Sequence, residues 1–445
     1  MRVAVIGAGY VGLVTSACLA DAGHTVVCVD LDAAKVEAIN ARRPPIHEQG
    51  LARLLARTVT ERLTATADLR GAVAASAVTF ITVGTPFDGQ RIDLAAVEQA
   101  TAAVGEALHD AVGYPVVVVK STVVPGTTDD VVVPLLERHS GKTAGKSIGV
   151  AMNPEFLREG QAIADFMHPD RIVLGIDDAR TLAVLEELYA VLPGAPVLHT
   201  TRRTAEMIKY VSNALLATLV SFANEIADLC AEVDGVDAVD VMRGVKLDRR
   251  LNPVLPDGAR VTPGVLDYLD PGCGFGGSCL PKDIHALTAF AADRGVPLRL
   301  LEQVVAVNDA RPLAMIRLLR RHFTDLSGRR VAVLGLAFKP GTDDLRCSPA
   351  LPIVHHLREA GARVAVYDPV VDARSLDGLW SASVDRCASL TDAVRSADAV
   401  LLVTRWPEFA DLPRVLDDLG VTPLVVDGRR MLEAGSVPRY EGIGR

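Results

Sequence analysis

Residues 3–12 read Val-Ala-Val-Ile-Gly-Ala-Gly-Tyr-Val-Gly, a short apolar run followed by three glycines in the spacing Gly-X-Gly-X-X-Gly. An apolar run that ends in glycine predicts a buried strand, and the uncharged residues after it predict a helix. Glycine at positions 7 and 9 permits a tight turn whose backbone approaches a phosphate, and Gly12 permits close packing of helix on strand. The stretch therefore predicts the first strand, turn and helix of a parallel α/β sheet.

Similar apolar runs recur through the first half of the chain. Runs that are apolar throughout, without alternation, are typical of strands buried on both faces of a parallel sheet. They alternate with helical stretches, which predicts a doubly wound α/β domain that ends near residue 200. The further runs lie at residues 25–30, 77–84, 115–122, 147–154 and 171–176.

A long helix is expected from about Thr204 to Ala231, because apolar residues recur there every three or four positions and line one face. Helical patterns continue to about His322 and are interrupted by a stretch rich in Pro and Gly at 252–277. The apolar residues of the long helix are Ala205, Ile208, Val211, Leu215, Leu219, Phe222, Ile226 and Leu229.

The first pattern returns after residue 328. Apolar runs at 331–335, 362–369, 398–407 and 422–430 resemble, in order, the first runs of the chain, a weak internal repeat. We therefore expect an α/β protein with two Rossmann-like, doubly wound parallel-sheet domains, joined by a long central helix and a helical middle region. The expected domains are residues 1–200, 201–325 and 326–445.

Composition narrows the class of protein. The 445 residues are 49% hydrophobic and 23% charged, which is ordinary for a globular chain. The net charge of −9, without basic runs, argues against a nucleic-acid partner. Seven cysteines, an odd number widely spaced, form no disulfide framework, so we expect a cytoplasmic protein. The uncharged stretch 3–20 imitates a secretory signal or membrane span, but its glycine spacing favours the buried strand and helix, and we expect no membrane association.

Asp30 identifies the dinucleotide. It ends the second predicted strand, about 20 residues after the first glycine, where an acidic side chain binds the ribose hydroxyls and repels a 2′-phosphate. A glycine-rich turn of a flavodoxin-like fold is the alternative. The strand before the turn together with Asp30 favours NAD.

A second candidate site is the stretch Gly-Cys-Gly-Phe-Gly-Gly-Ser-Cys-Leu-Pro-Lys-Asp at 272–283. Pro281 suits a first helical turn, which would place Cys279 at the N-terminal end of a helix. That position, with Lys282 beside it, favours the nucleophilic thiolate, whereas Asp283 opposes it. The alternative is a buried structural cysteine. The two cysteines of the stretch, without a second pair, lack zinc spacing, so no metal is expected.

Lys209 and Asn213 lie four residues apart on the long helix, off its apolar stripe, and so share a face. They would present a cation and an amide to a developing oxyanion. A solvated helix face explains the same spacing equally well. The sequence leaves this choice open.

Further polar residues follow strands at the edge where ligands bind in α/β sheets. Residues 153–160, Asn-Pro-Glu-Phe-Leu-Arg-Glu-Gly, follow the fifth run and carry Glu155 and Glu159, which also suit a helix start. Residues 84–86 (Gly-Thr-Pro) and 120–122 (Lys-Ser-Thr) end strands at the same edge, where hydroxyls contact a cofactor or cap helices.

Taken in order, these motifs and the stretch 337–346 resemble the UDP-glucose/GDP-mannose dehydrogenase family over nearly the whole chain. The stretch Gly-Phe-Gly-Gly-Ser-Cys before residue 280 looks closer to the UDP-glucose branch than to the N-acetylmannosamine branch, which usually reads Gly-Val-Gly-Gly-His-Cys. The resemblance implies a four-electron oxidation of a nucleotide-sugar C6 alcohol to a carboxylate by two NAD⁺, with UDP-glucose as substrate. TDP-glucose and GDP-mannose are the alternative substrates.

The resemblance also implies residue roles. Cys279 would add to the aldehyde to give a thiohemiacetal, whose second oxidation leaves a thioester that water hydrolyses. Lys209 and Asn213 would stabilise oxyanions. Asp283 and Glu155 would order or deprotonate water. Thr122 is the sixth residue of the implied catalytic site. The implied cofactor contacts are Gly7, Gly9, Tyr10, Val11, Gly12, Asp30, Lys35, Thr85, Thr122, Glu159, Lys282 and Arg346. The implied substrate contacts are Phe156, Leu157, Arg158, Lys209, Asn213, Arg260, Tyr268, Gly274, Phe275, Gly276, Lys339 and Arg429.

One segment departs from the family pattern. The family places Arg-Ile-Gly before the cysteine loop, and that arginine reaches the sugar bound to the neighbouring subunit of a dimer. Here the segment from Arg260 to the loop is longer, so Arg249, Arg250 and Arg260 are all candidates. We expect a homodimer formed through the central helix.

Two other classes of protein share part of this pattern. A two-electron hydroxyacid dehydrogenase shares a Rossmann domain followed by helices, but explains neither Cys279 nor the third domain. A non-catalytic binding protein would have lost at least one of the five central site residues, and all are present, namely Cys279, Lys209, Asn213, Asp283 and Glu155.

Overall fold

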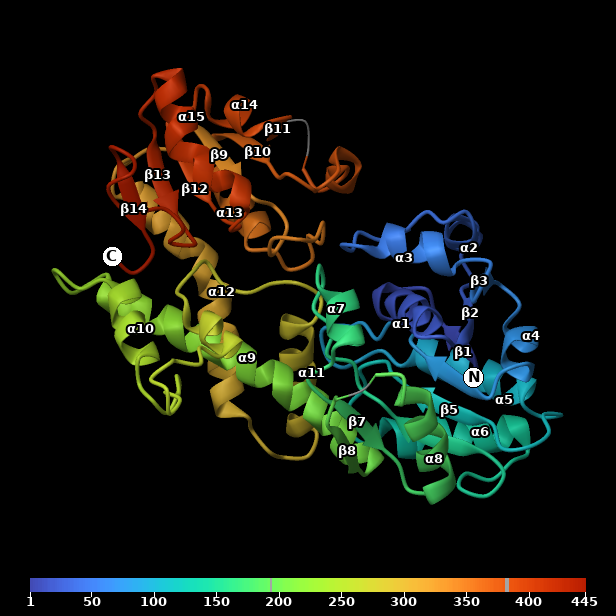
Figure 1. The fold of residues 1–445 in the computed structure, drawn as a ribbon. Coiled ribbons are helices and arrows are strands. Elements are labelled where there is room, and N and C mark those ends of the chain that lie inside the picture. The colour runs from blue at the N-terminus through green and yellow to red at the C-terminus, as the bar shows by residue number, and fades with distance from the viewer. Residues whose placement is uncertain (193, 381–383) are drawn as a thin grey trace. The chain divides into compact units, whose positions relative to one another are not determined.

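The computed structural model describes residues 1–192, 194–380 and 384–445, which divide into two compact units, Met1–Ser212 and Asn213–Arg445. Each unit is built on one sheet flanked by helices (Figure 1). The predicted fold class, two parallel-sheet α/β domains with a helical middle region, is confirmed.

The sheet of the first unit has eight strands in the order β3-β2-β1-β4-β5-β6-β7-β8. Neighbouring strands are parallel except β6 and β7, which meet in antiparallel fashion at Met152 and Gly175. The strands are β1 (Arg2–Ile6), β2 (Thr25–Val29), β3 (Leu63–Thr66), β4 (Val78–Ile81), β5 (Val116–Val119), β6 (Gly149–Met152), β7 (Ile172–Gly175) and β8 (Val197–Thr200).

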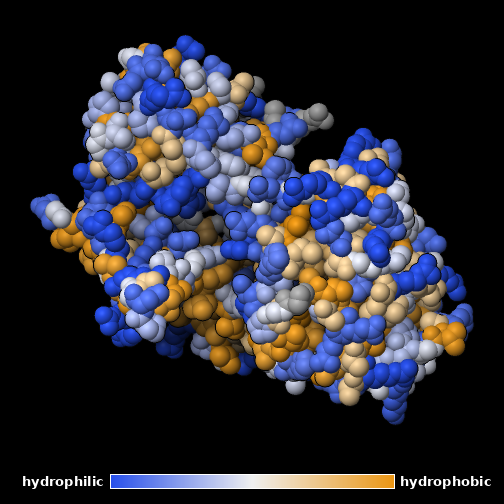
Figure 2. All heavy atoms as spheres, viewed as in Figure 1, coloured by the Kyte–Doolittle hydropathy of each residue, from blue (hydrophilic) through white to orange (hydrophobic). Residues whose placement is uncertain are grey.

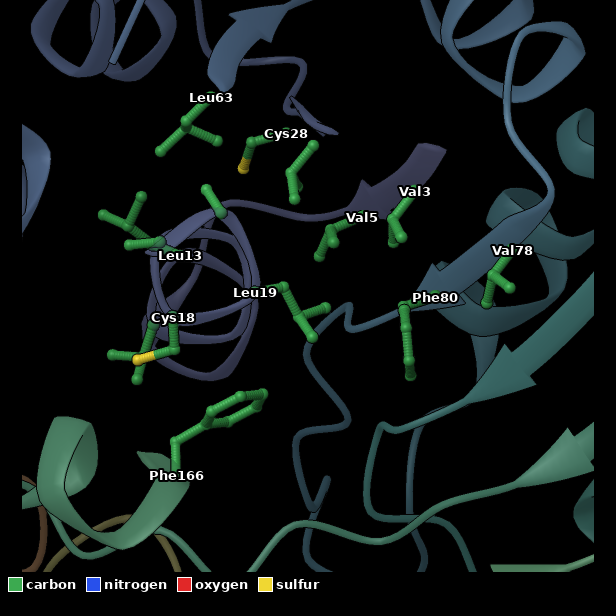
Figure 3. Packing of buried hydrophobic residues seen from close by; sticks show 14 of the residues in the cluster. Val3, Val5, Leu13, Cys18, Leu19, Cys28, Leu63, Val78, Phe80 and Phe166 are labelled. Carbon is green, nitrogen blue, oxygen red and sulfur yellow. The ribbon is translucent and has the colours of Figure 1, made fainter. Parts of the chain in front are cut away.

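Helices follow most of these strands. The uncharged stretch at 3–20 is β1 and α1, and its low charge reflects burial: Leu13, Cys18 and Leu19 of α1 lie against Val3 and Val5 of β1 (Figure 3). The helices are α1 (Tyr10–Asp21), α2 (Ala33–Asn40), α3 (Leu51–Thr58), α4 (Leu69–Ala74), α5 (Ala95–Ala107), η1 (Thr128–Val132), α6 (Val133–Ser140), α7 (Ala162–Met167) and α8 (Ala179–Tyr189). Within the described part of the chain, no helix is both long and apolar enough to span a bilayer.

The second unit repeats this plan on a smaller scale. Its six strands are parallel in the order β11-β10-β9-β12-β13-β14, so its first five strands follow the order of β3-β2-β1-β4-β5. They are β9 (Arg330–Leu334), β10 (Arg363–Tyr367), β11 (Val384–Arg386), β12 (Ala399–Leu402), β13 (Leu424–Asp427) and β14 (Tyr440–Gly442).

Helices α10, η2, α11 and α12 precede this sheet and form the helical middle region. The helices of the second unit are α10 (Ala238–Lys246), η2 (Gly264–Leu269), α11 (Leu280–Ala292), α12 (Arg299–Arg320), α13 (Ala350–Glu359), η3 (Ala373–Leu376), α14 (Leu390–Val394), η4 (Pro407–Asp411) and α15 (Leu412–Leu419).

Four strands escaped the sequence analysis: β3, β8, β11 and β14. All four lie at the edges of their sheets. An edge strand lacks a neighbour on one side and is not covered on both faces, as the exposed positions of β8 and β11 show. Such strands carry no continuous apolar run, which was the signal used to find the central ones.

The long helix is α9 (Arg202–Cys230). Four of the eight residues of its predicted apolar stripe are exposed: the fractions are 51% for Val211, 57% for Leu215, 48% for Phe222 and 63% for Leu229. The other four are buried or partly buried, namely Ala205, Ile208, Leu219 and Ile226. Hydrophobic residues accordingly reach the surface in the region of α9 and α10 (Figures 1 and 2). The face that the chain itself buries is the other one, lined by alanines and polar side chains.

Candidate active site

The turn between β1 and α1 has the geometry that its glycines predict. Gly7 adopts φ 102°, and its N–H donates to the Val29 carbonyl at 2.7 Å. A Cβ at position 12 would clash with the Gly7 carbonyl and the Thr82 hydroxyl, so only glycine lets α1 pack here. Gly9 is the N-cap residue of α1, and no side chain caps the helix there. No atom lies within 4 Å of the position that a Cβ of Gly9 would occupy. The backbone N–H groups of the first turn of α1 can therefore receive an anion.

Asp30 lies beside this turn. Its Oδ2 accepts from the Ala8 N–H at 2.7 Å, its Oδ1 accepts from the Asp32 N–H at 2.9 Å, and Lys35 Nζ lies 3.8 Å away. A carboxylate has about four acceptor positions, so two stay open to ribose hydroxyls. The open turn and the acidic partner fit the pyrophosphate and adenosine ribose of NAD.

The two threonines predicted at the sheet edge are neighbours: the Thr85 hydroxyl donates to the backbone carbonyl of Thr122 at 2.7 Å. Tyr10 is placed differently from a simple cofactor contact. Its hydroxyl donates to Glu48 and accepts from the Gly160 N–H at 2.9 Å, and Glu48 also accepts from Gly160 at 2.6 Å. Tyr10 and Glu48 thus fix the end of the 153–160 loop on α1.

Lys209 and Glu155 form a buried ion pair. Lys209 Nζ lies 2.8 Å from Glu155 Oε1, and the Leu157 N–H donates to Glu155 Oε2 at 2.7 Å. Burial acts to raise the pKa of Glu155, but the charge and hydrogen bond of Lys209 outweigh it and hold that pKa below its usual range. The solvated helix face that the spacing left open is wrong for Lys209 and Asn213, since both are buried.

A second buried cation lies below this pair. Lys120 Nζ donates to Asn153 Oδ1 at 2.8 Å, and Asn153 Nδ2 donates to the Val173 carbonyl at 2.8 Å. Burial lowers the pKa of Lys120 to about 8, with Glu155 opposing and Lys209 adding to the shift. A role for Lys120 was not predicted from the sequence; the signal that could have found it is a cation directly after a strand of four valines.

The other residues of the loop spread over its surface. The Phe156 ring lies 3.9 Å from the Arg171 guanidinium and 5.7 Å from Lys209 Nζ. Arg158 is exposed and pairs with Asp165 at 2.6 Å. The predicted contacts Val11, Leu157 and Glu159 are all partly exposed, and so accessible to a ligand.

In the second unit, Cys279 is the N-cap of α11, followed by Pro281 in the first turn, as predicted. It is partly exposed, whereas Cys273 is fully buried, donates to the Val403 carbonyl and has its pKa raised by that burial. None of the seven cysteines, all of which lie in the described residues, is in a disulfide. Of the two cysteines in the loop, Cys273 is the structural one and Cys279 has the position of a nucleophile.

Asp283 gathers the polar groups near Cys279. It lies one turn along α11 and donates its N–H to the Cys279 carbonyl at 2.9 Å. Its buried carboxylate accepts from Asn213 Nδ2 and from Lys282 Nζ, both at 2.6 Å. An amide, an ammonium group and a carboxylate thus meet at the start of the cysteine helix. The family resemblance assigned Lys282 to the cofactor; here it binds Asp283.

The glycine-rich loop before Cys279 is fixed by side chains. Gly274 (φ 101°) and Gly277 (φ 85°) need positive φ, and a Cβ at Gly276 would clash with the Cys347 carbonyl. The predicted substrate residue Arg429 donates to the Gly274 carbonyl at 3.1 Å. The Nη1 atom of Arg429 therefore lies beside the loop that carries Phe275.

The second unit has its own version of the first turn. Gly335 adopts φ 91°, and Asp368, at the end of β10, accepts from the N–H groups of Leu336 and Ala337 at 2.7 and 3.0 Å. Here Leu336 and Ala337 are buried, and Trp406 Nε1 also donates to Asp368 at 3.1 Å. The later glycines of the first turn are missing here, so this turn does not repeat the dinucleotide-binding pattern of β1 and α1.

Several predicted contacts have other partners within the second unit. Arg346 is exposed and binds Asp344 at 2.7 Å, although its carbonyl accepts from the Gly277 N–H at 2.8 Å. Arg250 pairs with Asp248, and Arg260 donates to the Leu247 carbonyl at 3.0 Å. The remaining predicted residues are partly exposed or exposed, namely Arg249, Tyr268 and Lys339. Among the described residues no group of three or more His, Cys, Asp or Glu side chains is placed to hold a metal ion.

These features define a class of protein: a dehydrogenase with an NAD-binding first unit and a cysteine-bearing second unit. Residues 1–193, 203–310 and 332–434 match the NAD binding, central and UDP binding domains of the UDP-glucose/GDP-mannose dehydrogenase family. The chain belongs to this family, whose members oxidise nucleotide sugars with NAD.

Three relatives illustrate the match. UDP-glucose 6-dehydrogenases of Rhizobium meliloti and Haloferax volcanii are 45% and 44% identical, over all of this chain and 100% and 99% of theirs. A solved UDP-glucose dehydrogenase from Pyrobaculum islandicum superposes with a TM-score of 0.89 at 38% identity, covering 99% of this chain and 97% of that one. The similarity therefore extends over both units.

Proposed function

We propose that the protein oxidises the C6 alcohol of UDP-glucose to UDP-glucuronate, with two NAD⁺ as oxidants. The observation that supports this most is the position of Cys279, which is outside any disulfide and partly exposed at the start of α11, near Asn213, Lys282 and Asp283. A two-electron oxidation needs no thiol, whereas passage from an aldehyde to an acid does. The UDP-glucose 6-dehydrogenases that match over the full chain support this substrate.

NAD⁺, when bound, accepts one hydride in each of the two oxidations. The residues proposed to hold it are those of the first turn, with Asp30 at the ribose, Lys35 beside Asp30, and Thr85 and Thr122 at the sheet edge. Overall, the alcohol and one water give the carboxylate, two NADH and three protons. We propose that the three predicted domains divide the work: residues 1–200 serve the cofactor, 201–325 carry the cysteine, and 326–445 hold the nucleotide.

The thiolate of Cys279 is proposed to form a bond to the aldehyde carbon, which gives a thiohemiacetal. Loss of its C6 hydride leaves a thioester, and water then breaks the carbon–sulfur bond and returns the thiolate. Asn213 donates one amide hydrogen to Asp283, which leaves a second for the oxyanion. Removing one such donor typically costs about 3–4 kcal/mol in the transition state.

The two carboxylates are proposed to act differently. Glu155 takes a proton from water poorly, because Lys209 holds its pKa low. Its role is to position Lys209, whose ammonium group stabilises oxyanions. Asp283 is the carboxylate that orders or deprotonates the hydrolytic water, since it lies one turn from Cys279.

Nucleotide binding is assigned to the loop 274–276 and to Arg429, which contact each other, with Lys339 from the domain matched as UDP binding. Phe156, Leu157 and Arg158 are proposed for the sugar. Initial rates of NADH formation with UDP-glucose, TDP-glucose, GDP-mannose and UDP-N-acetylmannosamine test the substrate. We expect the highest kcat/KM with UDP-glucose; a higher value with another sugar would assign the protein to that substrate instead.

The protein is also proposed to form a homodimer through α9. Val211, Leu215, Phe222 and Leu229 share one face of the helix and expose about half of each side chain, an apolar stripe that a second copy would cover. One of Arg249, Arg250 and Arg260 would then reach the partner's substrate. Sedimentation of the wild-type protein beside Phe222→Asp tests this. We expect a dimer and a monomer respectively, and a monomeric wild type contradicts it.

A reducing compartment, the cytoplasm, is proposed because the reaction requires the free thiol of Cys279. None of the seven cysteines is in a disulfide in the described structure, and two of them, Cys18 and Cys28, are buried in the core of the first unit. A disulfide at Cys279 would remove the nucleophile.

A further inference from the structure

The glycine-rich loop 272–277 is held through its backbone by side chains of two helices. On α9, Asn224 Oδ1 accepts from the Gly272 N–H at 2.8 Å. On α12, Asn308 accepts from the Phe275 N–H at 2.8 Å and donates to the Phe275 carbonyl at 3.3 Å. A loop of glycines has the largest conformational freedom to lose, so its shape depends on such bonds.

Arg311 joins these contacts into one network. Its Nε donates to the Gly272 carbonyl at 3.1 Å, and its Nη1 donates to the Asn224 carbonyl at 3.3 Å and to Asp228. The arginine is fully buried. One guanidinium group therefore binds the start of the loop, the backbone beside Asn224 and a carboxylate of α9.

The loop is also packed against Arg311 and Asn308. A Cβ on Gly274 would lie 2.9 Å from Asn308 Oδ1 and 3.3 Å from Arg311 Cβ. A side chain at position 274 would therefore push the loop away from α12, whereas glycine lets the loop lie close enough to form its hydrogen bonds with Asn308 and Arg311. The backbone between Gly272 and Phe275 is thus defined from both directions.

We propose that Arg311, with Asn308, is a positioning residue for the nucleotide-sugar site. It fixes the loop that presents Phe275 and Gly276 to the substrate and leads into Cys279, and it contacts neither substrate nor cofactor. The inference rests on the proposed function. Lysine cannot replace it, because one ammonium group cannot reproduce the planar fork that binds a carbonyl and a carboxylate together.

The test compares Arg311→Lys with Arg430→Lys. Arg430 is the control: its side chain is 9% exposed, pairs with Asp237 through both terminal nitrogens at 3.0 and 2.6 Å, and donates to the Ile443 carbonyl at 2.9 Å. We expect Arg311→Lys to lower kcat/KM for UDP-glucose about 100-fold, as misplacement of a site by about 1 Å does, and to leave the KM for NAD⁺ unchanged. Arg430→Lys should retain its kcat/KM.

Two further measurements separate positioning from stability. Amide hydrogen exchange of Phe275 and Gly277 should quicken in Arg311→Lys and not in Arg430→Lys, and added guanidinium should restore activity to Arg311→Ala. Equal losses of activity and melting temperature in both lysine variants, with unchanged loop exchange, would overturn the proposal. If Arg311→Ala fails to fold, Asn308→Ala is tested in its place. We expect faster amide hydrogen exchange in the loop of Asn308→Ala, and unchanged exchange would overturn the proposal.

The exchange measurement also distinguishes this proposal from the proposed function. It needs no substrate, so it reports on the loop even if the wild-type protein oxidises none of the nucleotide sugars. A wild type without activity but with the expected exchange pattern would reject the function and retain the role of Arg311 in the loop.

Discussion

Replacing Cys279 with serine is expected to abolish formation of the acid, with a loss of at least about 1,000-fold in kcat, and to leave NAD⁺ binding intact. A serine hydroxyl at this position has no adjacent base of the kind that activates it in hydrolases, whereas a thiol at a helix N-terminus ionises readily. The residues proposed to hold NAD⁺ lie in the first unit and are unchanged in this variant. Acid formation is measured as the uronate product, and NAD⁺ binding by calorimetry.

Cys387→Ser is the matched control, because Cys387 is also free and partly exposed but lies in the sheet region of the second unit. It should retain full activity. Full acid turnover by Cys279→Ser would reject the nucleophile, and loss of activity in both variants would indicate a general sensitivity to cysteine replacement.

Lys209→Met is expected to reduce kcat by about 10²–10³-fold, the typical loss for one oxyanion donor. It should also destabilise the fold by about 3–5 kcal/mol, because it leaves the buried carboxylate of Glu155 without its cation. Both values are measurable in the same preparation, by steady-state kinetics and by denaturant unfolding.

The stability loss should depend on pH. In the wild type the pKa of Glu155 is lower in the folded protein than in the unfolded chain. The ion pair therefore stabilises the fold at pH values above the pKa of the unfolded chain, and this stabilisation is lost as the pH falls through the pKa of the folded protein. Without Lys209, burial dominates and raises that pKa, so the variant is least stable at neutral pH and recovers as Glu155 takes up a proton. The gap in melting temperature should therefore narrow toward acidic pH, and a gap independent of pH contradicts the pairing.

The double variant Lys209→Met/Glu155→Gln provides the control. Removing the carboxylate removes the uncompensated charge, so the melting temperature should return toward the wild-type value. The kcat should stay low, because the ammonium group is still absent. Recovery of kcat in the double variant would show that Lys209 only balances Glu155 and does not act in the reaction.

Much of the fold followed from the sequence for a simple reason. The central strands are buried on both faces, so their sequences are continuous apolar runs. The turn at Gly7 requires a positive φ, which glycine adopts readily. The edge strands β3, β8, β11 and β14 lack that signal because solvent replaces a neighbour on one side.

The amphipathic pattern of α9 was found, but not the face it buries. Periodicity shows that Val211 and Phe222 share a side; it does not say what covers them. The burial of Lys209 depends on Glu155, more than 50 residues away in the chain, and helix spacing holds no trace of such a partner.

The positions of Asp30 beside the first turn and of Cys279 at the start of α11 followed from the sequence, because chemistry limits the choice of residue there. The residues that hold those groups in place were missed: Glu48 under the 153–160 loop, and Asn308 and Arg311 under the cysteine loop. These side chains bind backbone groups of segments that are distant in the chain. In the sequence they cannot be distinguished from polar side chains that face solvent.

The central claim is that one active site carries out both oxidations through Cys279. The most direct measurement is the yield of NADH when limiting UDP-glucose is consumed to completion with excess NAD⁺. The account predicts two NADH for each sugar, with UDP-glucuronate as the product. One NADH for each sugar, with the aldehyde accumulating, would contradict it.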